Sequence, residues 1–155
     1  MDSSEQFEVI ASVACAMALG GIIGFERELK NRPAGFRTHM LVAGTAALLV
    51  GLGLLLMADP RFRSPSLITM DPLRTVEAVI AGVAFIGAGT IFATRTGQAV
   101  AGITTAASLL MVAVIGVTAG FRYYLLALAI TLLTLAVLTV LRLVERFLTA
   151  RAKGD

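Results

Sequence analysis

Residues Leu19–Val42 read LGGIIGFERELKNRPAGFRTHMLV, and they join one apolar stretch of the chain to the next. Gly20 and Gly24 lie just before the charged residues, and their spacing lets another backbone approach closely within a membrane. Pro33 and Gly35 are typical of a turn. We therefore expect one apolar helix to end within this stretch and another to begin, with a cluster of charged side chains between them.

The composition of the whole chain favours a membrane protein. Its 155 residues suit one domain; 57% of them are hydrophobic and 15% are charged. The mean hydropathy is +0.88, and a soluble domain of this size could not bury that much apolar surface. The pI of about 9.6 then indicates basic loops beside anionic lipid rather than binding to nucleic acid.

Five apolar stretches are long enough, or nearly so, to cross a bilayer, which takes about 20 helical residues. They cover approximately residues 7–25, 39–57, 73–94, 99–119 and 121–141. We predict an all-α, polytopic transmembrane bundle of about five helices, with one domain over 1–145 and a basic cytoplasmic tail over 146–155. The acidic N-terminus lacks the positive region of a signal peptide, so we expect the first apolar stretch to be retained.

The distribution of Lys and Arg predicts the orientation of the bundle, because cytoplasmic loops carry an excess of these residues. With five spans, nine of the 13 Lys and Arg residues fall on one side of the membrane and four on the other. We therefore predict that the N-terminus is outside and the C-terminus inside. The first turn, the end of the third helix and the start of the fourth then meet at the cytoplasmic leaflet.

We expect a functional cluster at that leaflet. Its predicted members come from the first turn and from the start of the fourth helix: Glu26, Arg27, Arg37, Thr38, His39, Thr104 and Thr105. Glu26 and Glu28 lie about 200° apart around a helix, so they cannot share one metal ion from a continuous helix. Glu26 can instead pair with Lys30 at i,i+4. The alternative is that these charges only set the topology, and that His39 is only an interfacial cap or a hydrogen-bond partner.

The third predicted helix carries a second group of candidates. Arg74 and Glu77 share one face, and we predict an intramembrane ion pair because carboxylates at membrane depth need a partner; the alternative is contact with an ion or a proton. Continuing from Glu77, the residues at 81, 84 and 88 are all Ala, which indicates a tightly packed face. Four glycines are predicted to serve helix packing: Gly20, Gly24, Gly87 and Gly89. The last two alternatively mark bent helix ends that bring carbonyls to an ion.

Sequence signatures of enzymes are missing. The chain contains no catalytic-triad or nucleophile-elbow arrangement, no phosphate-binding loop and no dinucleotide fingerprint. His39 and Cys15 are its only histidine and cysteine, so a zinc site is not expected. We therefore predict a protein that is not an enzyme, with no catalytic residues and no cofactor other than the Mg²⁺ considered below.

Four blocks of sequence, taken together and in order, resemble the MgtC/SapB family of bacterial membrane proteins. They read GGIIGFERE at 20–28, AGFRTHMLV at 34–42, FIGAGT at 85–90 and GITTAA at 102–107. The resemblance covers about residues 7–141. The residues that fall on family motif positions are Glu26, Arg27, Gly35, Arg37, Thr38, Arg74, Gly87, Gly89, Thr104 and Thr105.

The resemblance also implies a location and a role. It implies a multi-pass protein of the bacterial inner membrane, linked to growth at low magnesium and to survival inside hosts. Some members look like regulators of other membrane proteins, including ATP synthase. We expect a short form without the soluble C-terminal domain that many relatives carry, which associates with itself and regulates through a partner or ion site near the cytoplasmic leaflet. The alternative is a homo-oligomeric transporter or channel for Mg²⁺ or another cation.

Overall fold

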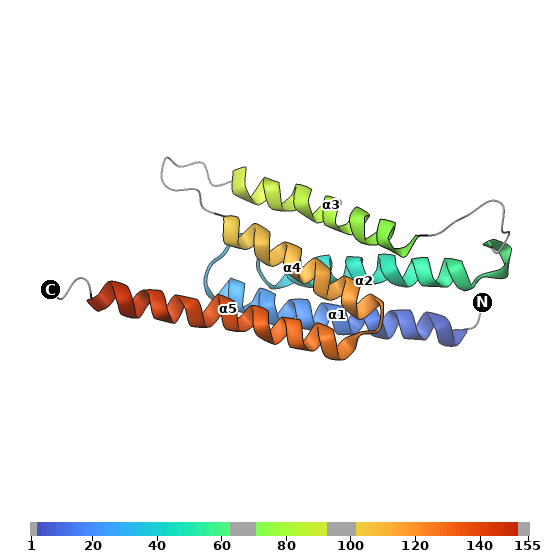
Figure 1. Cartoon of the computed structure of the whole chain (residues 1–155), viewed down its shortest axis with the longest axis horizontal. Coiled ribbons are helices and arrows are strands. Elements are labelled where there is room, and N and C mark those ends of the chain that lie inside the picture. The colour runs from blue at the N-terminus through green and yellow to red at the C-terminus, as the bar shows by residue number, and fades with distance from the viewer. Residues whose placement is uncertain (1–2, 63–70, 93–101, 152–155) are drawn as a thin grey trace.

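The computed structural model describes residues 3–62, 71–92 and 102–151, with side chains over 3–61, 71–91 and 102–140. The described chain is helical, which confirms the all-α prediction (Figure 1). It forms five α-helices and one short 3-10 helix: α1 (Ser3–Leu29), α2 (Phe36–Ala58), η1 (Pro60–Phe62), α3 (Pro72–Phe92), α4 (Ile103–Gly120) and α5 (Tyr124–Arg151).

Four of the described helices are long and apolar enough to cross a membrane, namely α1, α2, α3 and α4. The apolar part of α5 that has described side chains, Tyr124–Val140, is shorter. The prediction of a polytopic helix bundle is therefore confirmed, whereas the fifth crossing and the orientation stay predictions. Helix α5 also continues to Arg151, into the segment predicted as a tail. The predicted boundaries at 94 and 99 lie outside the described residues.

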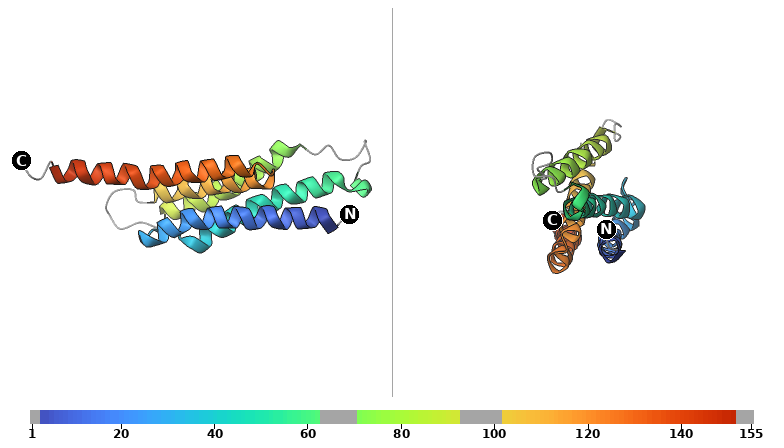
Figure 2. Two further views of the ribbon diagram at one scale, coloured as in Figure 1. Left: turned by 90° about the horizontal axis from the view of Figure 1, so that it is seen from below. Right: turned by 90° about the vertical axis from the view of Figure 1, so that its right-hand side faces the viewer.

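Consecutive helices run in opposite directions along the bundle (Figure 1). One end of the bundle gathers the end of α1, the start of α2, the end of α3 and the start of α4, on the left in Figure 1. We call this the turn end. Helix α4 contacts each of the other four helices, and α3 and α5 lie on opposite sides of it in the end-on view of Figure 2.

Hydrogen bonds at the end of α1 and at the start of α2 stabilise the turn between these two helices. The backbone N–H groups of Lys30 and Arg32 donate to the carbonyl of Arg27, and Asn31 adopts a left-handed conformation with φ of 51°. Asn tolerates that conformation better than most residues, so the helix can end there. At the start of α2, the N–H of Phe36 donates to Oε2 of Glu28 at 2.8 Å. A carboxylate from α1 therefore caps α2 and lies at the positive end of its dipole.

Two pairs of glycines let α2 pack closely between α1 and α4. A Cβ atom added to Gly20 would lie 2.7 Å from the carbonyl oxygen of His39, and one added to Gly24 would lie 2.8 Å from the Cβ of His39. On α4, a Cβ on Gly120 would lie 2.8 Å from the Cβ of Val50, and one on Gly116 would overlap the carbonyl oxygen of Ala43. The close approach of α2 to both neighbours therefore depends on these four glycines.

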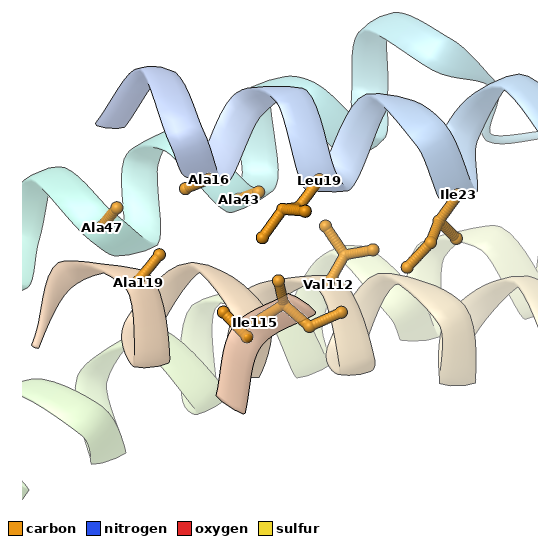
Figure 3. Close-up of a cluster of buried hydrophobic side chains, with 9 residues drawn as sticks. Ala16, Leu19, Ile23, Ala43, Ala47, Val112, Ile115 and Ala119 are labelled. Atoms are coloured by element: carbon orange, nitrogen blue, oxygen red, sulfur yellow. The ribbon is translucent and has the colours of Figure 1, made fainter. Parts of the chain in front are cut away.

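Small and branched apolar side chains fill the space that this close approach leaves. The cluster in Figure 3 joins α1, α2 and α4 through Ala16, Leu19, Ile23, Ala43, Ala47, Val112, Ile115 and Ala119. The alanines lie where backbones are closest, and the larger residues fill the gaps between them. Since these helices also form the turn end, this packing holds the polar groups of that end in place.

Helix α3 is the least buried of the four long apolar helices, with 17% of its most apolar window buried against 61% for α4. It packs on the bundle through Val79, Val83 and Gly87, and a Cβ on Gly87 would lie 3.3 Å from the Cβ of Ala106. Gly89 differs, because a Cβ there would have no described atom within 4 Å. The face predicted to be tightly packed, with Ala at 81, 84 and 88, is exposed because it points away from α2 and α4.

Candidate functional site

Arg27 is the centre of a buried polar group at the turn end. It lies in the last turn of α1, and its side chain is only 4% exposed. Its Nη2 atom donates to Oγ1 of Thr105 on α4 at 3.4 Å, and its Nη1 atom lies 3.9 Å from Oε2 of Glu26. A guanidinium held between two helices in this way is a structural feature with a high desolvation cost, which its neighbours must offset.

Glu26 and Lys30 form the ion pair that their i,i+4 spacing predicted. Glu26 is 11% exposed and lies close to both Arg27 and Lys30. Its Oε2 atom is buried and accepts no hydrogen bond from the described residues. The Nζ atom of Lys30 also donates to the carbonyl oxygen of Leu138 at 3.2 Å. This side chain therefore connects the end of α1 to α5, which brings a third helix into contact with the group.

His39 is completely buried, and both of its ring nitrogens have partners. Nδ1 lies 2.9 Å from the carbonyl oxygen of Gly35, which can only accept, so Nδ1 carries a proton. Nε2 lies 3.1 Å from Oγ of Ser108, and that hydroxyl also lies 2.8 Å from the carbonyl oxygen of Thr105. When His39 is neutral, its Nε2 atom accepts a hydrogen bond from the Ser108 hydroxyl. When His39 is protonated, Nε2 donates to Oγ of Ser108, and the Ser108 hydroxyl then donates to the carbonyl oxygen of Thr105.

The structure brings together some of the predicted cluster and separates the rest from it. Glu26, Arg27, His39 and Thr105 are gathered around the contact of α1, α2 and α4. We call these four residues together with Lys30 and Ser108 the buried cluster.

The other predicted members lie at the same end of the bundle but outside the buried cluster. Arg37 and Thr104 are exposed and Thr38 is half-buried. Arg37 makes no ion pair or hydrogen bond with any described residue. The helical period explains this difference, because residues 37 and 39 lie about 200° apart on α2. With His39 directed into the bundle, Arg37 points outward.

The other predicted group does not form within the described chain. Arg74 and Glu77 are both exposed on α3, and no ion pair joins them in the described part of the structure. They lie at the end of the bundle opposite to the turn end, since α3 begins there (Figure 1). These two residues therefore belong to a different surface from the buried cluster.

Sequence reasoning missed Ser108, Gly116 and Glu28. Ser108 follows Thr105 by three residues, so both lie on one face of α4, and this spacing was a signal that could have found it. Gly116 and Gly120 repeat the spacing of Gly20 and Gly24. The capping role of Glu28 depends on the path of the turn, for which the sequence gives no comparable signal.

Among the described residues, no group of three or more His, Cys, Asp or Glu side chains lies close enough to hold a metal ion. The charged side chains of the buried cluster are one carboxylate, a guanidinium and an ammonium group. Mg²⁺ prefers an octahedral set of oxygen ligands with few cations nearby. The buried cluster is therefore better suited to holding helices in one arrangement than to binding a bare divalent cation.

Further polar contacts join helices at the opposite end of the bundle. The Tyr124 hydroxyl lies 2.7 Å from Oγ of Ser12, and Arg122 forms an ion pair with Glu8 at 2.5 Å. These contacts attach the start of α5 to α1.

Asp59 forms a local ion pair after the end of α2. Arg61 donates to the Asp59 carboxylate from Nε and Nη2, the shortest distance being 2.6 Å. These hydrogen bonds lower the pKa of Asp59 to about 2.

The fold and the buried cluster define the class of the protein as a multi-pass membrane helix bundle with a charged centre at one end. A comparison with family models matches residues 13–147 to the MgtC family. The chain therefore belongs to the MgtC family. No solved structure matches the chain.

Curated proteins of several bacteria are similar to this chain. Protein MgtC of Brucella abortus is 38% identical over 132 residues, which are 85% of this chain and 50% of that protein. The protein named putative magnesium transporter YhiD of Escherichia coli K12 is 36% identical over 132 residues, which are 85% of this chain and 57% of that protein. Protein SapB of Bacillus subtilis is 34% identical over 117 residues, which are 76% of this chain and 49% of that protein. The chain thus spans about half the length of these relatives.

Proposed function

We propose that the chain is a non-enzymatic regulator in magnesium-limited cells and during stress inside a host. It resides in the bacterial inner membrane, with its N-terminus outside and the turn end at the cytoplasmic leaflet. Membership of the MgtC family and the name of the Escherichia coli relative support the link to magnesium. The proposal places the regulatory centre in the buried cluster.

The burial of Arg27 is the observation that carries this proposal. A charge buried in a helix bundle is costly, and a chain that needed only a stable bundle could use apolar residues there instead. Arg27 contacts α4 through Thr105, its neighbour His39 links α2 to α4, and Lys30 reaches α5. A change in charge or hydrogen bonding within the buried cluster would therefore alter the positions of four helices together, which is what a switch requires.

The exposed residues at the turn end are the proposed contact surface for a partner. These residues, Arg37, Thr38 and Thr104, lie at the same end of the bundle as the buried cluster but are not part of it. A partner could therefore bind them without replacing the contacts between the helices. Another membrane protein is the proposed partner, and the family resemblance points to ATP synthase. Co-purification from membranes tests this proposal: Arg37→Ala should lose the partner while the bundle stays folded. Retention of the partner by Arg37→Ala at wild-type yield would contradict it.

A second candidate is a transporter for Mg²⁺ or another cation that works as a homo-oligomer. The buried Oε2 atom of Glu26 favours it, because that oxygen accepts no hydrogen bond from a described residue and has lone pairs for an ion or a proton. Flux into proteoliposomes distinguishes the two functions. Saturable Mg²⁺ flux that is lost in Glu26→Gln would support transport and reject the regulator, whereas flux equal to that of empty liposomes would support the regulator.

A further inference from the structure

One stripe on the outer face of α3 consists of small and ionisable residues, and nothing in the described chain covers it, although the exposed Leu73 and Phe85 border it. The five residues of the stripe are Arg74, Glu77, Ala81, Ala84 and Ala88. At about 100° per residue, these positions fall within an arc on the order of 80°. Val79, Val83 and Gly87, which pack on α2 and α4, lie on the other side of the helix. The stripe therefore points away from the bundle.

The exposed face of α5 offers a comparison. Many of its side chains are large and apolar, among them Leu125, Leu128, Leu132 and Leu133, and Leu133 is 67% exposed. The stripe on α3 has three alanines and two ionisable residues instead. Small residues permit close contact between backbones, and ionisable residues in a membrane usually face protein or water. The contrast between this stripe and the exposed leucines of α5 indicates that protein covers the stripe.

The charges of the stripe indicate which protein covers it. Arg74 and Glu77 have opposite charges, lie about 4.5 Å apart along the helix axis and do not pair with each other within the described chain. Copies of one chain insert in the same direction, so a two-fold axis along the membrane normal places two α3 helices side by side at the same depth. Arg74 of each copy then reaches the partner's Glu77, and the alanines below allow the two helices to pack closely.

We infer that the stripe Arg74, Glu77, Ala81, Ala84 and Ala88 is an interface with a second copy of this chain. The interface is isologous, so every contact occurs twice, including the ion pair between Arg74 and the partner's Glu77. This pairing satisfies both charges without requiring either side chain to reach the membrane surface. The inference does not depend on the proposed function, since both a regulator and a transporter can be dimers.

Disulfide cross-linking in native membranes tests the inference. Cys15 is replaced by Ser, and Ala84→Cys is compared with Leu133→Cys, which places the thiol on the exposed face of α5. Under mild oxidation we expect Ala84→Cys to form a covalent dimer of this chain, and Leu133→Cys to stay largely monomeric. Equal cross-linking at the two positions would overturn the interface. So would a monomer at position 84, as expected for lipid on the stripe, or an adduct with a different protein.

The charges are tested in the same Ala84→Cys background. Arg74→Glu and Glu77→Arg should each reduce the covalent dimer severalfold, because each creates two like-charged contacts across the axis. The double variant Arg74→Glu/Glu77→Arg should restore it. Both side chains are exposed within one chain, so the helical content of all three variants should equal that of the parent. Cross-linking unchanged in the single variants, or not restored in the double variant, would overturn the proposed ion pairs.

Discussion

Nη2 of Arg27 on α1 lies 3.4 Å from Oγ1 of Thr105 on α4, although 78 positions separate the two residues in the sequence. Both residues are buried, with 3% of the surface of Arg27 as a whole and 2% of that of Thr105 exposed. The contact holds the ends of two helices together at the point where Glu26 and Lys30 add their charges. A charged side chain that joins two helices is therefore the main structural feature of the turn end.

Loss of the Arg27 charge should strongly destabilise the bundle. Arg27→Gln leaves Glu26 with Lys30 as its one ion-pair partner among the described residues, and breaking a buried charge pair costs about 3–5 kcal/mol. We expect a clear fall in the Tm of the purified protein in detergent. Arg122→Gln is the matched control, since its ion pair with Glu8 is largely exposed and contributes about 0–1 kcal/mol. Equal effects on Tm from the two substitutions would contradict the importance of the buried charge.

Gly24 and Gly89 should respond in opposite ways to alanine. A Cβ on Gly24 would lie 2.8 Å from the Cα of Phe36, so α1 and α2 must separate, at a cost of about 1–3 kcal/mol. At Gly89 the space within the described chain is open, and alanine favours the helix by about 1 kcal/mol. Thermal unfolding of Gly24→Ala and Gly89→Ala should show a lower Tm only for the first. A lower Tm for Gly89→Ala alone would show that Gly89, and not Gly24, is the closely packed glycine.

The Asp59–Arg61 ion pair should make stability depend on pH only in strong acid. The pKa of Asp59 in the folded chain, about 2, is below its ordinary value of 3.8, so the pair stabilises the folded state above about pH 4. This contribution disappears as the pH falls from about 4 through 2. The Tm difference between the wild type and Asp59→Asn should therefore be constant from pH 7 to 5 and shrink below pH 4. A difference that already shrinks near pH 6 would contradict the lowered pKa.

Helix α5 should loosen from α1 one end at a time. Lys30→Met removes the hydrogen bond to the carbonyl of Leu138 as well as the ion pair with Glu26, and Tyr124→Phe removes the 2.7 Å contact with Ser12. The loss of each hydrogen bond to or from α5 costs about 1 kcal/mol. Hydrogen exchange should become faster near residues 135–140 in the first variant and near 124–128 in the second. Uniform acceleration along α5 in both variants would show that the helix detaches as a unit instead.

The sequence predicted the bundle well because the signals for its helices are local. Apolar length and turn residues located the five helices, and the spacing of Gly20 and Gly24 indicated the close contact that α1 makes with α2. The pairing of Glu26 with Lys30 was equally predictable, since it depends on one helical turn.

Contacts between distant segments were harder to predict. The sequence predicted Arg37 and Glu26 in one cluster, but the register of α2 directs His39 inward and Arg37 outward. That register depends on the glycine contacts with α1 and α4, which are not visible in either segment alone. The alanine stripe on α3 was expected to be packed, and within one chain it is exposed, because a pattern of small residues does not say which chain supplies the neighbour.

The central claim, that the buried cluster is the working part of the protein, is tested most directly by growth at limiting magnesium of a strain that needs this chain. Thr105→Val removes the hydroxyl that Arg27 contacts while keeping the β-branched shape, and Thr105→Ser restores it. Thr118→Val is the matched control, since the Thr118 hydroxyl on the same helix donates to the carbonyl of Val114 within that helix. With equal amounts of each protein in the membrane, we predict that Thr105→Val grows poorly while Thr105→Ser and Thr118→Val grow like the wild type. Wild-type growth of Thr105→Val at the wild-type level of protein would contradict the account.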